Sequence, residues 1–313
     1  MAPRISVIIP AYNACASLAE TLDSVIGQTY DDWEAIVADD ASSDGTGDLA
    51  TSYHPRVSCV RSEHNRGIGG ARNLALAKAS GELVALLDAD DLWLSDYLQT
   101  QVAHYDEAVA AGENVGIVCC GAILLRPDGP RECVYSQRPA TLAALLRRNT
   151  IFVSAIIPRV LVEQLGGFAT DCLGTEDYDM WLRIVETGRT VLVVDEPLAI
   201  YRVGDTTVST NVVGMARAMQ TTYRHALERG RLHVRERAIV RRELRLQRLI
   251  ELRAEAAWRA EAGRLPVTVI ARAIPLSVRV VLERPKLWLL GPRLFVRSLR
   301  GVRAAGVGRS PAA

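Results

Sequence analysis

The stretch Glu82-Leu-Val-Ala-Leu-Leu-Asp88-Ala-Asp90-Asp91 decides the fold, because an uninterrupted apolar run ends abruptly in three carboxylates within four positions. A short apolar run with such a boundary predicts a strand that is buried on both faces. Ligands of open parallel sheets gather just beyond the carboxyl ends of the strands, so the acids lie where a site is expected. If the strand stays extended, Asp88 and Asp90 point to the same side and repel each other unless a cation intervenes.

A hard divalent cation would remove this repulsion. Mg²⁺ or Mn²⁺ takes few protein oxygens and fills its other positions with water and substrate phosphate. The spacing of Asp88 and Asp90 therefore suggests a site for a nucleotide diphosphate. A solvated acidic turn that caps the following helix is the alternative, and the triplet alone does not separate the two.

Three other short apolar segments precede this stretch, at residues 5–9, 33–38 and 57–61. Each is followed by turn residues and a helical pattern, and Ser17-Leu-Ala-Glu20 has the form of a capping box that starts the first helix. Strands that alternate with helices predict an α/β fold with a mostly parallel sheet flanked by helices.

The composition is that of a globular protein, since 313 residues of which 49% are hydrophobic can build a sizeable core. No run reaches the ~18 apolar residues of a membrane span, and the N-terminus lacks a signal-peptide pattern, so we expect a cytoplasmic protein. The cysteines are scattered without metal-like spacing, which predicts reduced core cysteines rather than a zinc site. They are Cys15, Cys59, Cys119, Cys120, Cys133 and Cys172.

Charge divides the chain into two parts: residues 1–200 hold 14 basic and 28 acidic side chains, whereas residues 201–313 hold 23 basic and 8 acidic ones. Residues 213–230 and 232–262 have a helical, arginine-rich pattern, most simply a solvated and paired face. Residues 267–281 and 287–299 are apolar with interspersed arginine, which is typical of helices that lie on an anionic membrane. A docking helix or a homodimer contact is the alternative. Nucleic acid is not an expected partner, because few aromatic residues interleave the arginines.

Several motifs in series resemble those of the family 2 glycosyltransferases. They cover about 200 residues, and a series of four or five is far more specific than any one alone. They are Ile5-Ser-Val-Ile-Ile-Pro10-Ala-Tyr12-Asn13, Val37-Ala-Asp39-Asp40-Ala-Ser-Ser-Asp44-Gly45-Thr46, Asn65-Arg66-Gly67, Ala71-Arg72-Asn73, Asp88-Ala-Asp90-Asp91, Gly166-Gly167-Phe168 and Glu176-Asp177-Tyr-Asp-Met-Trp181-Leu-Arg183.

The resemblance implies a glycosyltransferase A-type fold, a nucleotide-sugar donor, Mg²⁺ or Mn²⁺ as the cofactor, and inversion at the anomeric carbon. We expect residues 1–207 to form the catalytic domain and residues 208–313 a helical basic region. If that region binds the membrane, the protein is peripheral on the inner face of the plasma membrane and the acceptor is a lipid-linked saccharide.

The resemblance also implies roles for single residues. Asp39 would accept hydrogen bonds from a uracil ring, although Asp39 and Asp40 could instead only cap a helix or tighten a turn, as we expect of Asp44. The guanidinium of Arg72 would point toward phosphate from the start of a helix. Asp90 would bind the metal. The residues assigned to nucleotide-sugar binding are Pro10, Tyr12, Asn13, Asp39, Arg66, Arg72 and Asp88.

Glu176 and Asp177 precede an apolar helical pattern and so fall in the first turn of a helix. A helix start favours ionised carboxylate, which is the form that a base needs. Helix starts also attract acids without any catalysis, but the resemblance implies that Asp177 deprotonates the acceptor hydroxyl and that Glu176 orients it. We expect Trp181 to pack in the core and Arg183 to form a salt bridge.

Two departures from the family pattern matter. Family members often have Tyr-Arg-x-His after the last strand, whereas here Tyr201-Arg202-Val203 is followed by Gly204-Asp205, so either Asp205 replaces the histidine or the metal is held by Asp90 and phosphate alone. The Gln-x-x-Arg-Trp signature of processive synthases is absent, so we expect transfer of one sugar per encounter. A catalytically inactive sugar-nucleotide-binding or membrane-associated scaffold is the alternative function.

Overall fold

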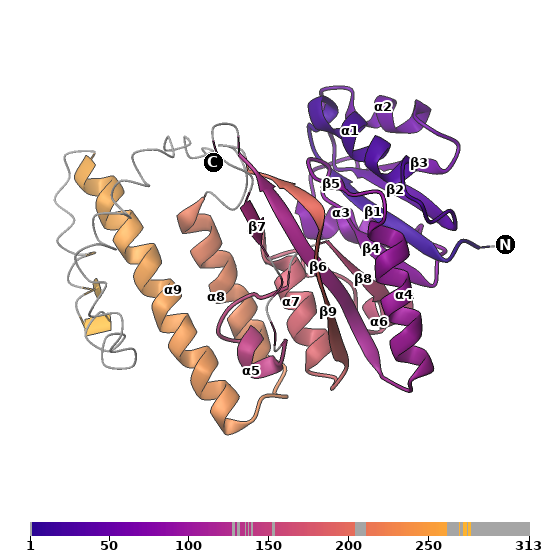
Figure 1. Ribbon diagram of the computed structural model, residues 1–313. Helices are drawn as coiled ribbons and strands as arrows, with labels where there is room; N and C mark the ends of the chain where they lie inside the picture. Colours follow the sequence, from indigo (N-terminus) through magenta and orange to yellow (C-terminus); the bar gives the residue numbers. More distant parts are fainter. Residues whose placement is uncertain are drawn as a thin grey trace.

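The computed structural model describes residues 2–126, 132–134, 140–151, 154–203 and 211–261, with isolated residues at 129, 136, 138, 269, 272, 273, 275 and 276. A twisted sheet lies between two sets of helices, and two further long helices pack outside one of these sets (Figure 1). The described residues include no helix that is long and apolar enough to cross a membrane.

The first half of the sheet is parallel, as the sequence predicts. Its strands are β1 (Ile5–Ala11), β2 (Trp33–Asp39), β3 (Val57–Arg61) and β4 (Leu83–Leu86), in the order β3-β2-β1-β4. Every residue of β1 and β4 is buried, because helices cover both faces of the sheet there. The register pairs Ala11 with Asp39 and Asp39 with Arg61, so the carboxyl ends of these strands meet at one edge.

The helices of this half connect the parallel strands. They are α1 (Cys15–Ile26), α2 (Thr46–Ser52) and α3 (Gly67–Leu76). The capping-box prediction for α1 is wrong, since the helix begins at Cys15 and the amide of Ala14 donates to the Thr46 hydroxyl at 2.9 Å. A side chain from the start of α2 therefore replaces the local cap.

The second half of the sheet mixes directions. The order continues through β8 (Ala155–Pro158), β6 (Val115–Leu125), β9 (Thr190–Arg202) and β5 (Leu92–Trp93), while β7 (Glu132–Val134) pairs with β6. β8 is antiparallel to both β4 and β6, whereas β6 and β9 are parallel. The sheet as a whole is mixed, and the mostly parallel character that we predicted holds for its first four strands.

Two apolar cores fill the two faces of the sheet. One is completed by α1 and α4 (Tyr97–Ala110), and the other by α3, α6 (Arg159–Gln164) and α7 (Glu176–Val185). A short helix, α5 (Leu142–Leu145), adds Leu145 to the second core. Trp181 has no exposed surface and Arg183 pairs with Asp179 at 2.8 Å, so both predictions for these residues are confirmed.

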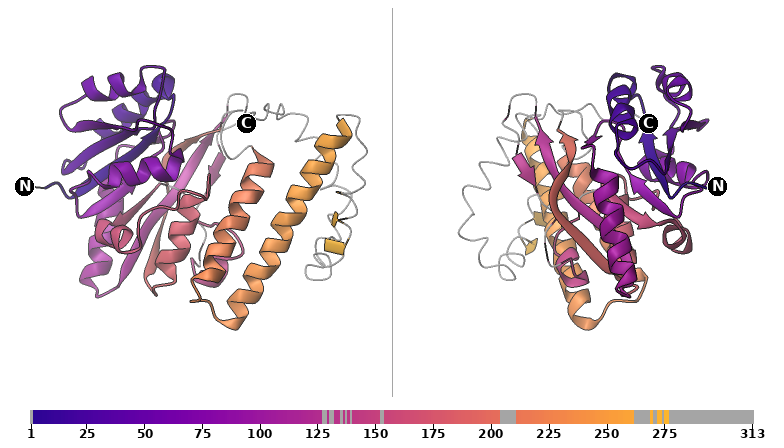
Figure 2. Two further views of the ribbon diagram at one scale, coloured as in Figure 1. Left: turned by 180° about the vertical axis from the view of Figure 1, so that it is seen from behind. Right: turned by 45° about the vertical axis from the view of Figure 1, so that its right-hand side comes forward.

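The predicted helices of the basic region are present as α8 (Val212–Glu228) and α9 (Val234–Glu261), which pack against each other in both views of Figure 2. α8 also packs on α7, so it is in direct contact with the helix that carries Glu176 and Asp177. The predicted domain boundary at residue 207 lies outside the described residues. So do Asp205 and almost all of residues 267–299.

Candidate active site

The three acids after β4 lie in a turn rather than along an extended strand. β4 ends at Leu86, and the Asp91 amide donates to the Asp88 carbonyl at 3.1 Å. The extended chain on which a shared side of Asp88 and Asp90 depends is therefore not present, because the chain turns here toward β5, although the negative charge of Asp88 does raise the pKa of Asp90. Asp90 is exposed, Asp88 is partly buried and Asp91 is buried.

Asp91 acts as an internal support and caps no helix. Its Oδ1 accepts a hydrogen bond from the Arg202 amide at 3.0 Å, and its Oδ2 has no partner within the described part of the chain. Burial raises the pKa of Asp91, and the negative charges of Asp88 and Asp90 raise it further. A bound cation would offset this repulsion, so the all-oxygen donor set fits Mg²⁺ or Mn²⁺, with the exposed Asp90 best placed to reach it.

Arg72 joins the end of β4 to the start of α7. Its guanidinium is 1% exposed and donates to Asp88 Oδ1 at 2.7 Å and to Glu176 Oε1 at 2.5 Å. The prediction that Arg72 points toward phosphate is therefore wrong, because two carboxylates already occupy the buried guanidinium. The bridge places the predicted donor side and the predicted base side of the site next to each other.

The pKa values of Glu176 and Asp177, at the start of α7, are both raised. The pKa of Asp177 is raised to about 7. Burial is the largest cause and the negative charge of Glu176 adds to it, while the positive charge of Arg72 lowers the pKa. Burial likewise raises the pKa of Glu176, against the charge of Arg72. The pKa of each carboxyl is therefore raised, whereas the helix start was expected to favour the ionised form, since desolvation outweighs the helix dipole.

The segment before α7 is fixed by α3. The amide of Asn73 spans Phe168, donating to its carbonyl at 2.8 Å and accepting from its N–H at 2.7 Å. A Cβ on Gly69 would lie 2.1 Å from the Ala169 carbonyl oxygen, so only glycine allows this approach. The Gly174 amide then donates to Glu176 Oε2 at 2.9 Å.

The acidic side chains of the loop after β2 accept hydrogen bonds from the loop itself and from neighbouring segments. Asp39 accepts from the Ser42 amide at 2.9 Å and from Arg61 Nε at 3.1 Å, so it does tighten a turn. Both oxygens of Asp40 accept from the Arg66 amide, at 2.8 and 3.0 Å. The predicted turn role of Asp44 is confirmed by its hydrogen bond from the Thr46 amide at 3.1 Å.

The remaining predicted donor-binding residues surround this loop. Pro10 is buried within β1, and Tyr12 just beyond the strand is 55% exposed. Asn13 has a φ of 50°, and its side-chain oxygen accepts from the Ser43 amide at 2.9 Å. Arg66 donates through Nε to the Ser62 hydroxyl at 2.9 Å. An exposed aromatic ring beside the ends of β1 and β2 is suited to stack on a base.

Sequence reasoning missed Arg61 and Arg202. Arg61 pairs with Asp39, and a signal for this existed, because both residues end neighbouring parallel strands. Arg202 supports Asp91 through a backbone amide, for which no side-chain pattern exists. All six cysteines are free, but Cys133 is exposed rather than in the core.

Comparison with known proteins gives concordant matches. The model of Glycosyl transferase family 2 matches residues 6–152. A Bacillus subtilis protein named as a teichuronic acid biosynthesis glycosyltransferase, TuaG, is 34% identical over 238 residues, which is 74% of this chain and 90% of its own. The Escherichia coli UDP-Glc:alpha-D-GlcNAc-diphosphoundecaprenol beta-1,3-glucosyltransferase WfgD is 31% identical over 186 residues, or 58% of this chain and 70% of its own.

The fold has solved counterparts. The mannosyltransferase PcManGT from Pyrobaculum calidifontis, in complex with GDP-Man and Mn²⁺, matches with a TM-score of 0.61 and 24% identity. The match covers 98% of this chain and 89% of that one.

Replacing Asp177 with Asn is expected to change how stability depends on pH. The pKa of Asp177 is raised from 3.8 to about 7 in the folded chain, so between these values the folded state holds a proton that the unfolded state releases. The free energy of unfolding therefore falls as pH rises through this range. Asp177→Asn should flatten that slope and be more stable than the wild type above about pH 8, by roughly 1–4 kcal/mol.

Urea unfolding over this pH range measures the effect. Asp96→Asn serves as the control, because Asp96 is exposed and lies just before α4, and it should retain the wild-type slope. An Asp177→Asn slope equal to that of the wild type would contradict the assignment of a raised pKa to this carboxyl.

Proposed function

Because the chain belongs to glycosyltransferase family 2, we propose that it moves one sugar from a uridine-diphosphate sugar to a hydroxyl of a lipid-linked saccharide, with inversion. That it is a glycosyltransferase with a glycosyltransferase A-type fold follows from the family and from the matched structures. The donor, the acceptor, the metal and the residue roles are the proposal. The observation that carries it is the Arg72 bridge between Asp88 and Glu176.

The donor would bind at the carboxyl ends of β1, β2 and β4. Tyr12 would stack on the base, and Asp39 would accept from it while keeping its bonds to Ser42 and Arg61. Arg66 and Asn13 hold the backbone around this subsite through Asp40 and Ser43. WfgD, whose name gives a UDP-Glc donor, supports a uridine nucleotide here.

Asp90 would hold Mg²⁺ or Mn²⁺ through an exposed carboxylate. The cation, when bound, would neutralise charge on the departing diphosphate. Asp88, held by Arg72, would contact the donor ribose from the adjacent position. The solved PcManGT complex contains Mn²⁺, which supports a divalent ion in this fold.

Asp177 would be the base. A pKa near 7 lets its carboxylate take the proton of the acceptor hydroxyl at neutral pH, as that oxygen attacks the anomeric carbon from the face opposite the diphosphate. Glu176 is placed by Arg72 and Gly174, and its charge helps to keep the pKa of Asp177 high. Arg72 thus acts indirectly, by holding Asp88 and Glu176 in fixed relation.

The acceptor and the location come from the relatives and from the basic region. WfgD carries GlcNAc-diphosphoundecaprenol in its name, and TuaG is named for teichuronic acid biosynthesis, which together support surface polysaccharide assembly on a lipid carrier. We propose that the basic residues beyond α9 bring the enzyme to the anionic inner face of the plasma membrane. The division at residue 207 and the homodimer stay predictions.

Calorimetry with UDP and Mn²⁺ tests the division of roles. Asp90→Ala should lose at least about tenfold in Mn²⁺-dependent UDP affinity, because the ion loses its protein ligand. Asp177→Asn should bind UDP like the wild type but transfer roughly 10²–10⁴-fold more slowly, because no base remains. Wild-type UDP affinity in Asp90→Ala would refute the metal assignment, and binding without turnover in the wild type would favour the inactive scaffold.

The pH dependence of transfer tests the base. The rate should rise with pH through an apparent pKa near 7, because Asp177 must be ionised. Glu176→Gln removes the adjacent negative charge that raises this pKa, so the rising limb should move to lower pH. Glu163→Gln, on the exposed side of α6, is the control and should leave the limb in place. An unmoved limb in Glu176→Gln would contradict the assignment.

Vesicle flotation tests the membrane proposal. The full chain should float with vesicles that contain anionic lipid, and changing Arg279, Arg284, Arg293 and Arg297 together to Gln should abolish this, since each basic residue contributes about 1 kcal/mol. The matched control changes four exposed arginines before and along α9: Arg231, Arg235, Arg241 and Arg253. Equal flotation by the two quadruple variants would exclude the proposed surface.

A further inference from the structure

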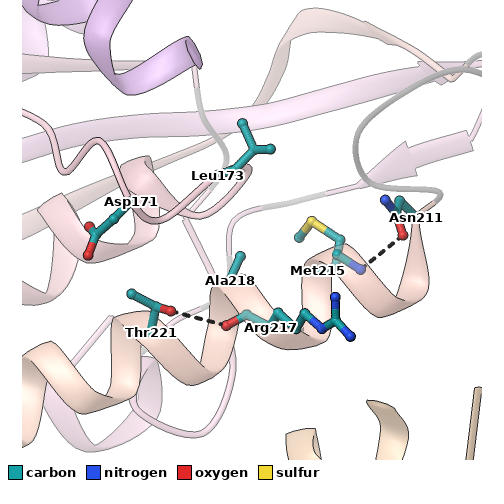
Figure 3. A pocket seen from close by; sticks show the side chains of 8 residues that line it. Asp171, Leu173, Asn211, Met215, Arg217, Ala218 and Thr221 are labelled. Carbon is teal, nitrogen blue, oxygen red and sulfur yellow. Dashed lines mark hydrogen bonds between the residues drawn. The ribbon is translucent and has the colours of Figure 1, made fainter. Parts of the chain in front are cut away.

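A cleft of about 240 Å³ lies between the loop that leads into α7 and the first half of α8. Figure 3 shows Asp171 and Leu173 on the loop, facing Met215, Ala218 and Thr221 on the helix. The hollow exists because Gly214 and Ala218 present almost no side chain to the loop. No residue that we assign to donor or metal binding lines it.

The lining combines apolar surface with one exposed cation. Leu173 is 59% exposed, a large value for leucine, and Val212, next to the lining residue Asn211, is 48% exposed. The side chain of Arg217 is 66% exposed and extends toward the N-terminal end of α8 (Figure 3). Such a mixture suits a ligand that has both a sugar ring and an anionic group.

Arg217 is held in place from behind. Its Nε donates to Glu251 Oε1 at 2.9 Å, and Glu251 is fixed in turn by Gln220 at 3.0 Å and Arg248 at 2.5 Å. Although burial raises the pKa of Glu251, these hydrogen bonds lower it to about 2, so the anchor stays charged. An arginine anchored through one edge is preorganised to offer its other nitrogens to phosphate.

The loop that lines the cleft continues along the chain into the segment that carries the proposed base. Its loop wall runs from Asp171 and Leu173 directly into Glu176 and Asp177, at the start of α7. The same loop is fastened to α8, since Thr175 and Thr222 share a hydrogen bond of 2.9 Å and His225 Nε2 lies 3.1 Å from Asp171 Oδ2. The loop that forms one wall of the cleft is thus held on α8, and it carries the proposed base four residues after Leu173.

We propose that this cleft binds the glycosyl-diphosphate head of the acceptor, with the sugar against Leu173 and Met215 and a phosphate at Arg217. This assignment rests on the proposed function, because it takes Asp177 as the base. It gives α8 a direct part in acceptor recognition. The lipid chain itself would leave the cleft through its open side.

Acceptor kinetics and binding test the assignment on the full-length enzyme. The probe is GlcNAc α-diphosphate with a short prenyl chain, and methyl α-GlcNAc serves as the acceptor without phosphate. Arg217→Ala should raise the KM for the diphosphate about tenfold, as expected for a lost charged hydrogen bond, with a smaller effect on the methyl glycoside. Leu173→Ser should raise the KM for both acceptors.

Two matched controls separate the cleft from general effects. Arg235→Ala removes an equal charge from an exposed position of α9, and Val160→Ser polarises an exposed apolar side chain on α6; neither residue lines the cleft. Both should keep wild-type values. Saturation-transfer NMR with the diphosphate probe and UDP should show contact in the wild type and its loss in Arg217→Ala, independently of turnover.

The outcomes distinguish this inference from the proposed function. Equal KM and NMR contact in Arg217→Ala and Arg235→Ala would overturn the cleft assignment, as would absence of probe binding by a wild type that hydrolyses UDP-sugars. Probe binding in the cleft by a wild type that neither binds UDP nor hydrolyses UDP-sugars would overturn the proposed function and leave the cleft as a glycosyl-diphosphate site.

Discussion

The buried guanidinium of Arg72 is the contact on which the site depends. It lies between a carboxylate from the end of β4 and one from the start of α7, two elements separated by about ninety residues. An unpaired buried charge costs about 3–5 kcal/mol, so neither carboxylate can leave the pair without a large penalty. The bridge thus fixes the end of β4 against the start of α7, the two segments that we propose for the donor and for the base.

The same charge sets the chemistry of its neighbours. Desolvation raises the pKa of both Glu176 and Asp177, the positive charge of Arg72 lowers both values, and the negative charge of Asp88 raises both. The balance leaves the pKa of Asp177 at about 7, the range that suits the base that we propose. The helix dipole, which is the local rule for acids in a first turn, is the weaker effect here because these side chains are desolvated.

Sequence patterns predicted the features that are local. Apolar runs predicted β1 to β4 and the bounds of α8 and α9 to within a few residues, because burial and helical spacing are written in consecutive residues. The direction of Arg72 and the turn at Asp88 were missed, since both depend on where distant elements pack. Arg61 is intermediate: its contact with Asp39 follows from strand register once the strand order is known.

The loop before α7 is held in different ways on its two sides. On one side, the side-chain amide of Asn73 hydrogen-bonds the backbone of Phe168, and the backbone of Gly69 approaches Ala169 so closely that little change is tolerated. On the other side, α8 holds it only through side chains, namely Thr222 and His225, and leaves a cleft open. Side-chain contacts can be exchanged without moving a backbone. If the cleft binds the acceptor as we propose, side chains along α8 can therefore change the acceptor while the start of α7 stays in place.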